Sequence, residues 1–208
     1  TLTFIDMEAK QIVKTQELKL PKLKSSAFKL EITDNGKYIV CAHYKDIYFW
    51  DISQEKRLKS IESAHAYHIS SFEITQDSKL AVTGSLDFTV AITDIAQQKI
   101  IHRFQGAHTA NVHALSISSD NRYLFSGSAA KDIAIWDLEE RKLLHRFADV
   151  CDEELRALRV SQDNKYLGFA SSTNSIDLIP LSLQKVKFSL KPEDSAIWEV
   201  IISPNGEH

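Results

Sequence analysis

Apolar residues recur at a fixed interval along the chain, each just before a polar turn that contains Asp or Asn. Five segments share this pattern, in which a short apolar stretch ends in Ile or Val and Thr or Ser follows. These five anchor residues are Ile32, Ile74, Ile117, Val160 and Ile202, at intervals of 42, 43, 43 and 42 residues. A period of about 40–45 residues is typical of propeller blades and of helical arrays.

The residue types between the anchors favour β-strands over helices. Each turn is followed by two short apolar runs rich in β-branched and aromatic residues, such as Tyr123–Phe125 and Ile133–Trp136. A more polar run then closes the unit, for example 142–147. The Asp- and Asn-containing turns recur too often to leave room for helices of about ten residues or more. Each unit is therefore predicted to contain four short antiparallel strands.

A single sheet of this kind has two apolar faces, so neighbouring sheets have to stack around a channel to exclude water. The predicted fold class is all-β, a β-propeller of four-stranded antiparallel blades, with four full and two partial blades. We expect one incomplete propeller domain over 1–208. Its predicted parts are the end of a blade at 1–24, full blades at 25–63, 64–106, 107–150 and 151–193, and the start of a blade at 194–208.

Short motifs in the same register resemble the WD-repeat family, whose unit runs from a Gly-His pair through a Ser-Gly-Ser-x-Asp turn to a terminal Trp-Asp. The matching segments are Ala64-His65 and Ala107-His108, Thr83-Gly84-Ser85-Leu86-Asp87 and Ser126-Gly127-Ser128, and Trp50-Asp51 and Trp136-Asp137. The resemblance covers nearly the whole chain. Propellers of this family usually have about seven blades, so the resemblance implies that this chain is about two thirds of a ring.

The resemblance also implies a network of hydrogen bonds that links His, Ser or Thr, Asp and Trp within a blade. The matching residues are His65, Thr83 and Asp87 in the second full unit, His108, Ser126 and Trp136 in the third, and Trp50 in the first. Thr93 replaces the Trp of the second unit, and Ala130 stands where the Asp of the third is expected. We therefore expect an incomplete network in every unit, with aliphatic packing between blades supplying most of the stability.

The residue four positions before each anchor is predicted to begin the first strand, beside the mouth of the channel. These rim residues are Phe28, Ser70, His113, Arg156 and Trp198. In WD-repeat proteins this rim commonly contacts partners, and Arg and Trp are frequent hot-spot residues in interfaces. The alternative that Phe28 and Trp198 pack against loops stays open at this point.

Charge and cysteine content narrow the class of partner and the compartment. The chain has 25 Lys and Arg against 28 Asp and Glu, a near balance that does not favour a nucleic-acid partner. Two cysteines in 208 residues do not form a disulfide framework, which favours a reducing compartment. No apolar run is long enough to span a bilayer. We expect an intracellular, cytoplasmic protein, with a cytoskeletal, ciliary or nuclear location left open.

No motif in the sequence indicates catalysis, a cofactor or a metal. His-Glu-x-x-His, Cys-x-x-Cys and a phosphate-binding glycine loop are all absent, and His65 and His68 have no third ligand close in sequence. The carboxylates lie in turns at repeating places, and no pair is singled out. A basic stretch at 10–29 and an acidic stretch at 149–154 are either solvated surface or regions that steer a charged partner.

The predicted function is a non-catalytic protein–protein interaction scaffold that assembles a multi-protein complex, with other proteins as its partners. Two alternatives stay open. One is an architectural component of a large cytoskeletal or ciliary assembly. The other is a reader of modified peptides or of nucleic acid.

Overall fold

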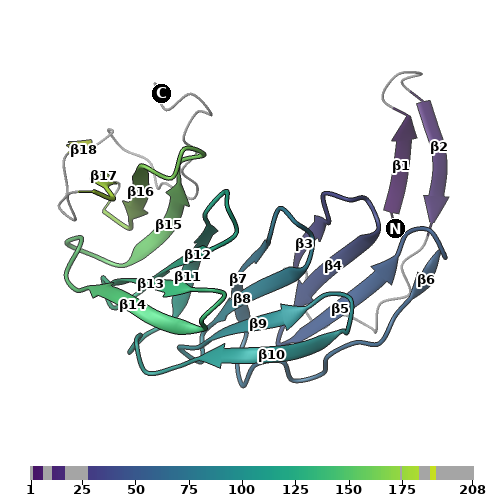
Figure 1. Cartoon of the computed structure of the whole chain (residues 1–208), viewed down its shortest axis with the longest axis horizontal. Helices are drawn as coiled ribbons and strands as arrows, with labels where there is room; N and C mark the ends of the chain where they lie inside the picture. The colour runs from purple at the N-terminus through teal and green to yellow at the C-terminus, as the bar shows by residue number, and fades with distance from the viewer. Residues whose placement is uncertain (1, 7–10, 17–27, 174, 183–187, 191–208) are drawn as a thin grey trace.

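A computed structural model of the chain describes residues 2–6, 11–16, 28–173, 175–182 and 188–190, and these contain strands and no helix. Four four-stranded sheets stand side by side along an open arc (Figure 1). Within each sheet the strands follow chain order and pair antiparallel with the next. The predicted all-β propeller fold is thus confirmed.

The bounds of the strands follow the predicted runs closely. In the first sheet they are β3 (Phe28–Ile32), β4 (Tyr38–His43), β5 (Asp46–Asp51) and β6 (Lys56–Arg57). In the second sheet they are β7 (Ile69–Ile74), β8 (Leu80–Ser85), β9 (Val90–Asp94) and β10 (Lys99–Phe104). The third sheet contains β11 (Val112–Ile117), β12 (Tyr123–Ser128), β13 (Ile133–Asp137) and β14 (Lys142–Phe147). The fourth contains β15 (Leu155–Val160), β16 (Tyr166–Ser171), β17 (Ile176–Pro180) and β18 (Phe188–Leu190).

A two-stranded antiparallel sheet precedes these four. It consists of β1 (Leu2–Asp6) and β2 (Gln11–Gln16), and it stands at the same end of the arc as the first sheet (Figure 1). The segment predicted to begin a further blade, 194–208, lies outside the described residues. The described residues contain no helix of the length and apolar character that a membrane crossing requires.

The apolar interior lies between the sheets. Each of the three large clusters of buried side chains combines residues from two neighbouring sheets. Examples are Phe49 with Phe72, Ile92 with Leu124, and Phe125 with Phe169. The second strand of each sheet is buried along nearly its whole length, as expected for a strand covered on both faces.

The polar turn after each anchor has the same hydrogen bonds in all four sheets. In the third sheet Ser118 Oγ donates to Asp120 Oδ1 at 2.5 Å and accepts from Tyr123 N at 2.8 Å. Thr33, Thr75 and Ser161 make the equivalent pairs of bonds. The recurring Thr or Ser followed by Asp or Asn is therefore explained by local turn chemistry.

The connections between strands fall on two faces because antiparallel strands alternate in direction. We call one the loop face, formed by the loops 58–68, 105–111 and 148–154 and the turns 44–45, 86–89 and 129–132. The opposite turn face is formed by the turns after each anchor and the turns between third and fourth strands. Each first strand begins at the loop face, so the predicted rim belongs to it.

Candidate functional site

The first strands of the sheets form the inner wall of the arc and enclose a cavity of about 230 Å³. Its polar lining residues are Lys29, Ser71, His113, Arg156 and Arg159. The remaining lining residues are apolar. This is the place where the predicted channel would lie.

The structure brings two of the five predicted rim residues together. His113 and Arg156 are half-buried and line the same cavity. Ser70 instead donates its hydroxyl to Val112 O at 2.5 Å and to Gly84 O at 3.3 Å, which fastens β7 to β11. Phe28 begins β3 and is described by its backbone only, and Trp198 lies outside the described residues. A partner-binding role for the rim stays a prediction.

Among the described rim residues, Arg156 supplies a cation and His113 supplies a neutral ring. The Arg156 guanidinium is 36% exposed and donates to Glu154 Oε2 at 2.5 Å. Burial, together with the neighbouring Arg156 charge, lowers the pKa of His113 below its ordinary value. His113 is therefore an uncharged imidazole at neutral pH, able both to donate and to accept a hydrogen bond.

A second set of polar side chains on the inner strands was missed by the sequence analysis. In the first three sheets, the residue just before the anchor accepts a hydrogen bond from the anchor N–H of the next sheet. Ile74 N donates to Glu31 at 3.2 Å, Ile117 N to Glu73 at 2.9 Å, and Val160 N to Ser116 at 3.0 Å. The signal was available in the sequence, because these polar residues interrupt apolar strands at a constant position.

At the same position of the fourth sheet stands Arg159, which cannot accept a hydrogen bond. It reaches back past the third sheet, donating to Leu115 O at 3.1 Å, and forms an ion pair with Glu73 of the second sheet. Burial raises the pKa of Glu73 to about 7, although Arg159 and the Ile117 N–H both favour its ionised form. The inner wall thus contains a carboxyl group, that of Glu73, whose pKa of about 7 lies near neutral pH.

The polar network of the third sheet closes through a residue that the sequence analysis did not choose. His108 Nε2 lies 2.6 Å from Ser126 Oγ, and Trp136 Nε1 donates to the same hydroxyl at 2.8 Å. His108 Nδ1 lies 2.6 Å from Asp132 Oδ1. The expectation of a missing carboxylate at Ala130 is therefore corrected, because Asp132, two residues later, supplies it.

Asp132 is held as an anion by its neighbours. Burial alone would raise its pKa, but hydrogen bonds from His108 and Ser128 and the Arg146 guanidinium outweigh this effect and lower the pKa to about 2. Arg146 Nε donates to Asp132 Oδ2 at 2.9 Å, and Ser128 Oγ donates to Oδ1 at 2.5 Å. The carboxylate therefore has a donor on each oxygen, which is what a fully buried charge requires.

The second sheet has a related network without the Trp. His65 Nδ1 lies 3.0 Å from Asp87 Oδ2, and His65 Nε2 lies 2.9 Å from Thr83 Oγ1. Thr93 fills the Trp position, and its buried hydroxyl has no hydrogen-bond partner among the described residues. In the first sheet the Nε1 of Trp50 likewise has no such partner. Burial and the nearby Arg103 charge lower the pKa of His65, although Asp87 raises it.

The third-sheet network has the connectivity of a Ser-His-Asp catalytic triad but not its accessibility. Ser126, His108 and Asp132 are 0%, 5% and 0% exposed. The Ser126 hydroxyl already accepts from Trp136, and the cavity of the inner wall is lined by other residues. A nucleophile needs an approach path and a place for the reacting carbonyl. We therefore interpret the network as structural. The described residues also contain no cluster of His, Cys, Asp and Glu able to hold a metal ion.

One known protein family matches two stretches of this chain. The family described as WD domain, G-beta repeat, matches residues 56–94 and 98–137. Each match begins at the outer strand of one sheet and ends with the third strand of the next. Comparison with curated proteins gives no significant match.

Two solved structures have a similar fold. The structure titled "Structure of U3-55K" has a TM-score of 0.72 and 16% identity, over 81% of this chain and 52% of that one. The structure titled "Crystal structure of RRP9 WD40 repeats" has a TM-score of 0.68 and 17% identity, over 76% of this chain and 49% of that one. This chain therefore spans about half the length of each. At these identities the likeness establishes the fold alone.

Proposed function

Because this chain belongs to the WD-repeat β-propeller family, we propose that it is a non-catalytic scaffold that binds other proteins through its loop face. One observation carries the proposal. The His and Ser side chains of the buried network are held in hydrogen bonds that stabilise the fold, whereas the loop face keeps polar side chains at the mouth of the cavity. His108 and Ser126 are buried in the structural network, while Arg156 and His113 remain half-exposed.

The architecture supports binding rather than catalysis. Strands fixed by neighbours on both faces hold the rim side chains on a rigid support, and such surfaces bind partners with little loss of conformational entropy. The near balance of charge over the chain supports proteins as partners rather than nucleic acid. We propose an intracellular location, in accordance with the two unpaired cysteines, Cys41 and Cys151.

The test compares two arginines on opposite faces. Arg156→Ala, alone and combined with His113→Ala, removes the cation of the rim. Arg122→Ala is the matched control, because Arg122 is a 52% exposed arginine on the turn face that also pairs with a carboxylate, Asp137. Proteins captured by the wild-type chain would be identified, and their affinities for each variant measured by interferometry.

We expect the rim variants to bind at least about tenfold more weakly, as for a hot-spot residue, and the Arg122 variant to bind as the wild type does. Circular dichroism melting curves would verify that all variants are folded. Unchanged affinity of the folded rim variants, or an equal loss in the Arg122 control, would refute a loop-face scaffold. An activity that resides in the purified chain would refute the non-catalytic part.

A further inference from the structure

Small side chains at one position of the inner strands leave room for the cavity of the inner wall. Three residues before the anchor stand Ser71, Ala114 and Ala157, in the second, third and fourth sheets, and all three line the cavity. In the first sheet Lys29 takes this position and lines the cavity as well. The volume of about 230 Å³ lies below the roughly 300–1,000 Å³ of pockets for drug-sized ligands. The cavity therefore suits one side chain of a partner.

The cations that line this cavity keep hydrogen-bond donors that the fold does not use. The Lys29 ammonium makes no hydrogen bond and no ion pair with any described residue. Arg156 donates through Nη2 alone, to Glu154, and Arg159 donates through Nη1 alone, to Glu73 and to a backbone carbonyl. The Nε and the second Nη of each guanidinium therefore have no acceptor within the part of the chain that the structure describes.

Carboxyl groups lie near these cations, but none is among the residues that line the cavity. Glu154 and Glu73 pair with the two arginines, and Glu31 accepts from Ile74 N of the next sheet. If all three were ionised, they would balance the three cations. Burial raises the pKa of Glu31, and that of Glu73 to about 7, so part of the positive charge is uncompensated at neutral pH. This surplus suits the single charge of a carboxylate better than the roughly two charges of a phosphate group.

We propose that this cavity binds the carboxylate of an Asp or Glu side chain that projects from a partner protein. A guanidinium group matches a carboxylate with two parallel N–H bonds, and a lysine adds a compact charge. Arg156 and Arg159 would hold the carboxylate from the fourth sheet, and Lys29 from the first. The inference rests on the scaffold function and adds the chemical group by which the partner is recognised.

The same geometry predicts that a proton is taken up when the carboxylate binds. Glu73 on β7 faces Arg159 from β15, Glu31 from β3 and the Ile117 N–H from β11. An ionised Glu73 holds the Arg159 guanidinium and repels a second carboxylate, whereas a protonated Glu73 does neither. Affinity should therefore rise as the pH falls from about 8 to about 6.5. His113 stays mostly neutral over this range, because burial lowers its pKa.

The test removes a cation that has no partner of its own. Lys29→Gln deletes one lining charge without leaving a described carboxylate unpaired, and Lys79→Gln is the matched control, a 76% exposed lysine on the turn face. The probe is a displayed library of random twelve-residue peptides. Peptides enriched by the wild-type chain would be titrated by fluorescence anisotropy, with each acidic residue also replaced by Asn, Gln or phosphoserine. Circular dichroism melting curves would verify that the variants are folded.

We expect the enriched peptides to share an Asp or Glu whose replacement by Asn or Gln weakens binding to the wild type and to Lys79→Gln at least about tenfold. The same replacement should weaken binding to Lys29→Gln much less, because the cation that it faces is already absent. Glu73→Gln should bind more tightly than the wild type at about pH 8 and lose the pH dependence, because it cannot ionise.

Three results would overturn the proposal: enriched peptides that need no acidic residue, tighter binding of the phosphoserine peptides, or equal losses in Lys29→Gln and Lys79→Gln. Affinity that Glu73→Gln leaves unchanged at about pH 8 would also count against it. If Arg156→Ala abolishes protein capture while Lys29→Gln captures the same proteins as the wild type does, the carboxylate assignment fails and the scaffold function stands.

Discussion

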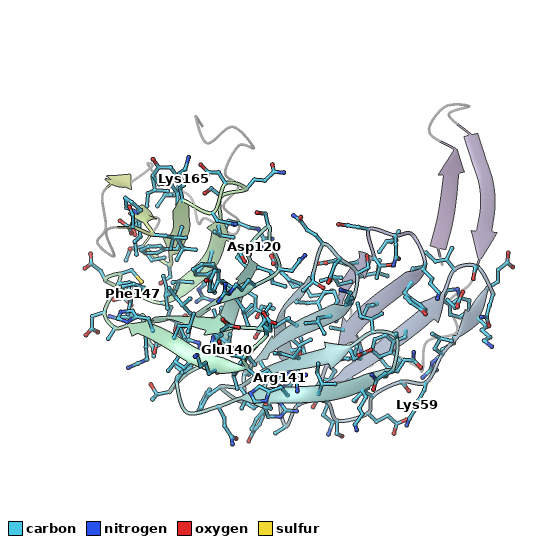
Figure 2. The ribbon with its side chains drawn as sticks, in the orientation of Figure 1. Lys59, Asp120, Glu140, Arg141, Phe147 and Lys165 are labelled. Carbon is cyan, nitrogen blue, oxygen red and sulfur yellow. The ribbon has the colours of Figure 1, made fainter. Side chains whose placement is uncertain are left out.

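Residues of one type can have opposite roles within a single sheet, depending on what surrounds them. Thr83 and Thr93 are both buried in the second sheet, yet Thr83 meets His65 Nε2 at 2.9 Å and Thr93 has no partner among the described residues. The side chains packed around the sheet are visible as sticks in Figure 2. Burial of a hydroxyl costs free energy unless a hydrogen bond compensates for it. The two threonines are therefore expected to respond oppositely to the same change.

Thr93→Val is expected to raise the free energy of unfolding by up to about 1 kcal/mol, because it replaces an unsatisfied hydroxyl with a methyl group of similar size. Thr83→Val is the control and is expected to lower it by about 1–3 kcal/mol, because His65 loses its partner. Urea denaturation measures both. A destabilised Thr93→Val variant would show that this hydroxyl has a partner after all.

The residue-level pattern could be predicted only in part. The family motif predicted His65, Thr83 and Asp87, and the structure places Thr83 and Asp87 within hydrogen-bond distance of the two ring nitrogens of His65. Asp132 was missed, because the turn of the third sheet supplies its carboxylate two residues later than in the second. The positive φ of Tyr44, 57°, could not be foreseen, since the sign of a backbone φ is not visible in a residue name.

Turns join neighbouring sheets as well as consecutive strands. On the turn face, Asn121 accepts from Gln76 N at 2.8 Å, and Asn164 accepts from Ser119 N at 3.0 Å. Both asparagines have positive φ, of 60° and 57°. Each asparagine thus closes its own hairpin through its backbone conformation and binds the preceding sheet through its side-chain amide. These two contributions to stability can be separated by substitution.

Asn121 allows these two effects to be measured separately. Asn121→Gly keeps the backbone conformation and removes the amide, for an expected loss of about 1 kcal/mol from the hydrogen bond. Asn121→Ala also removes the amide and lacks the tolerance of Asn and Gly for positive φ, for a further loss of about 1 kcal/mol. The expected order of stability in urea denaturation is wild type, then Gly, then Ala. Equal stability of the three chains would show that the contact between the two turns contributes nothing.

Whole strands were predicted better than single contacts. The anchors Ile32, Ile74, Ile117 and Val160 each end the first strand of a sheet, as their spacing predicts. Strand positions depend on local apolar runs and turn residues, which a sequence displays directly. A polar residue at a constant strand position marks a side chain able to bond between sheets, but its partner depends on how the sheets are placed in space, and no local pattern identifies that partner.

At the scale of the whole molecule, the ion pair of Arg159 with Glu73 joins residues 86 positions apart. It spans from the fourth sheet to the second across the inner wall, so it depends on the curvature of the whole arc. Sequence spacing predicted that sheets stack, but it could not predict which side chains would meet across the inner wall. The pair therefore reports on the assembled arc rather than on any one sheet.

The raised pKa of Glu73 predicts a pH-dependent stability. Its value of about 7 in the folded chain exceeds the ordinary carboxyl value of about 4.3. Protonation therefore stabilises the folded state, and this contribution is lost as pH rises through about 7. Between about pH 5 and pH 8 the wild type should lose stability relative to Glu73→Gln, which does not titrate at this position. A stability difference that is constant over this range would contradict the assignment.

Each of the three large apolar clusters is shared by two adjacent sheets, so these sheets bury most of their apolar side chains only against a neighbour. Such an array behaves like a one-dimensional cooperative chain, in which order at one site favours order only at the adjacent sites. Amide protons should accordingly exchange most slowly in the second and third sheets, which have a described four-stranded neighbour on either side. The same sharing restricts how such a sequence can evolve. Inserting or deleting a segment keeps the apolar contacts on both of its sides only if the segment is a whole blade.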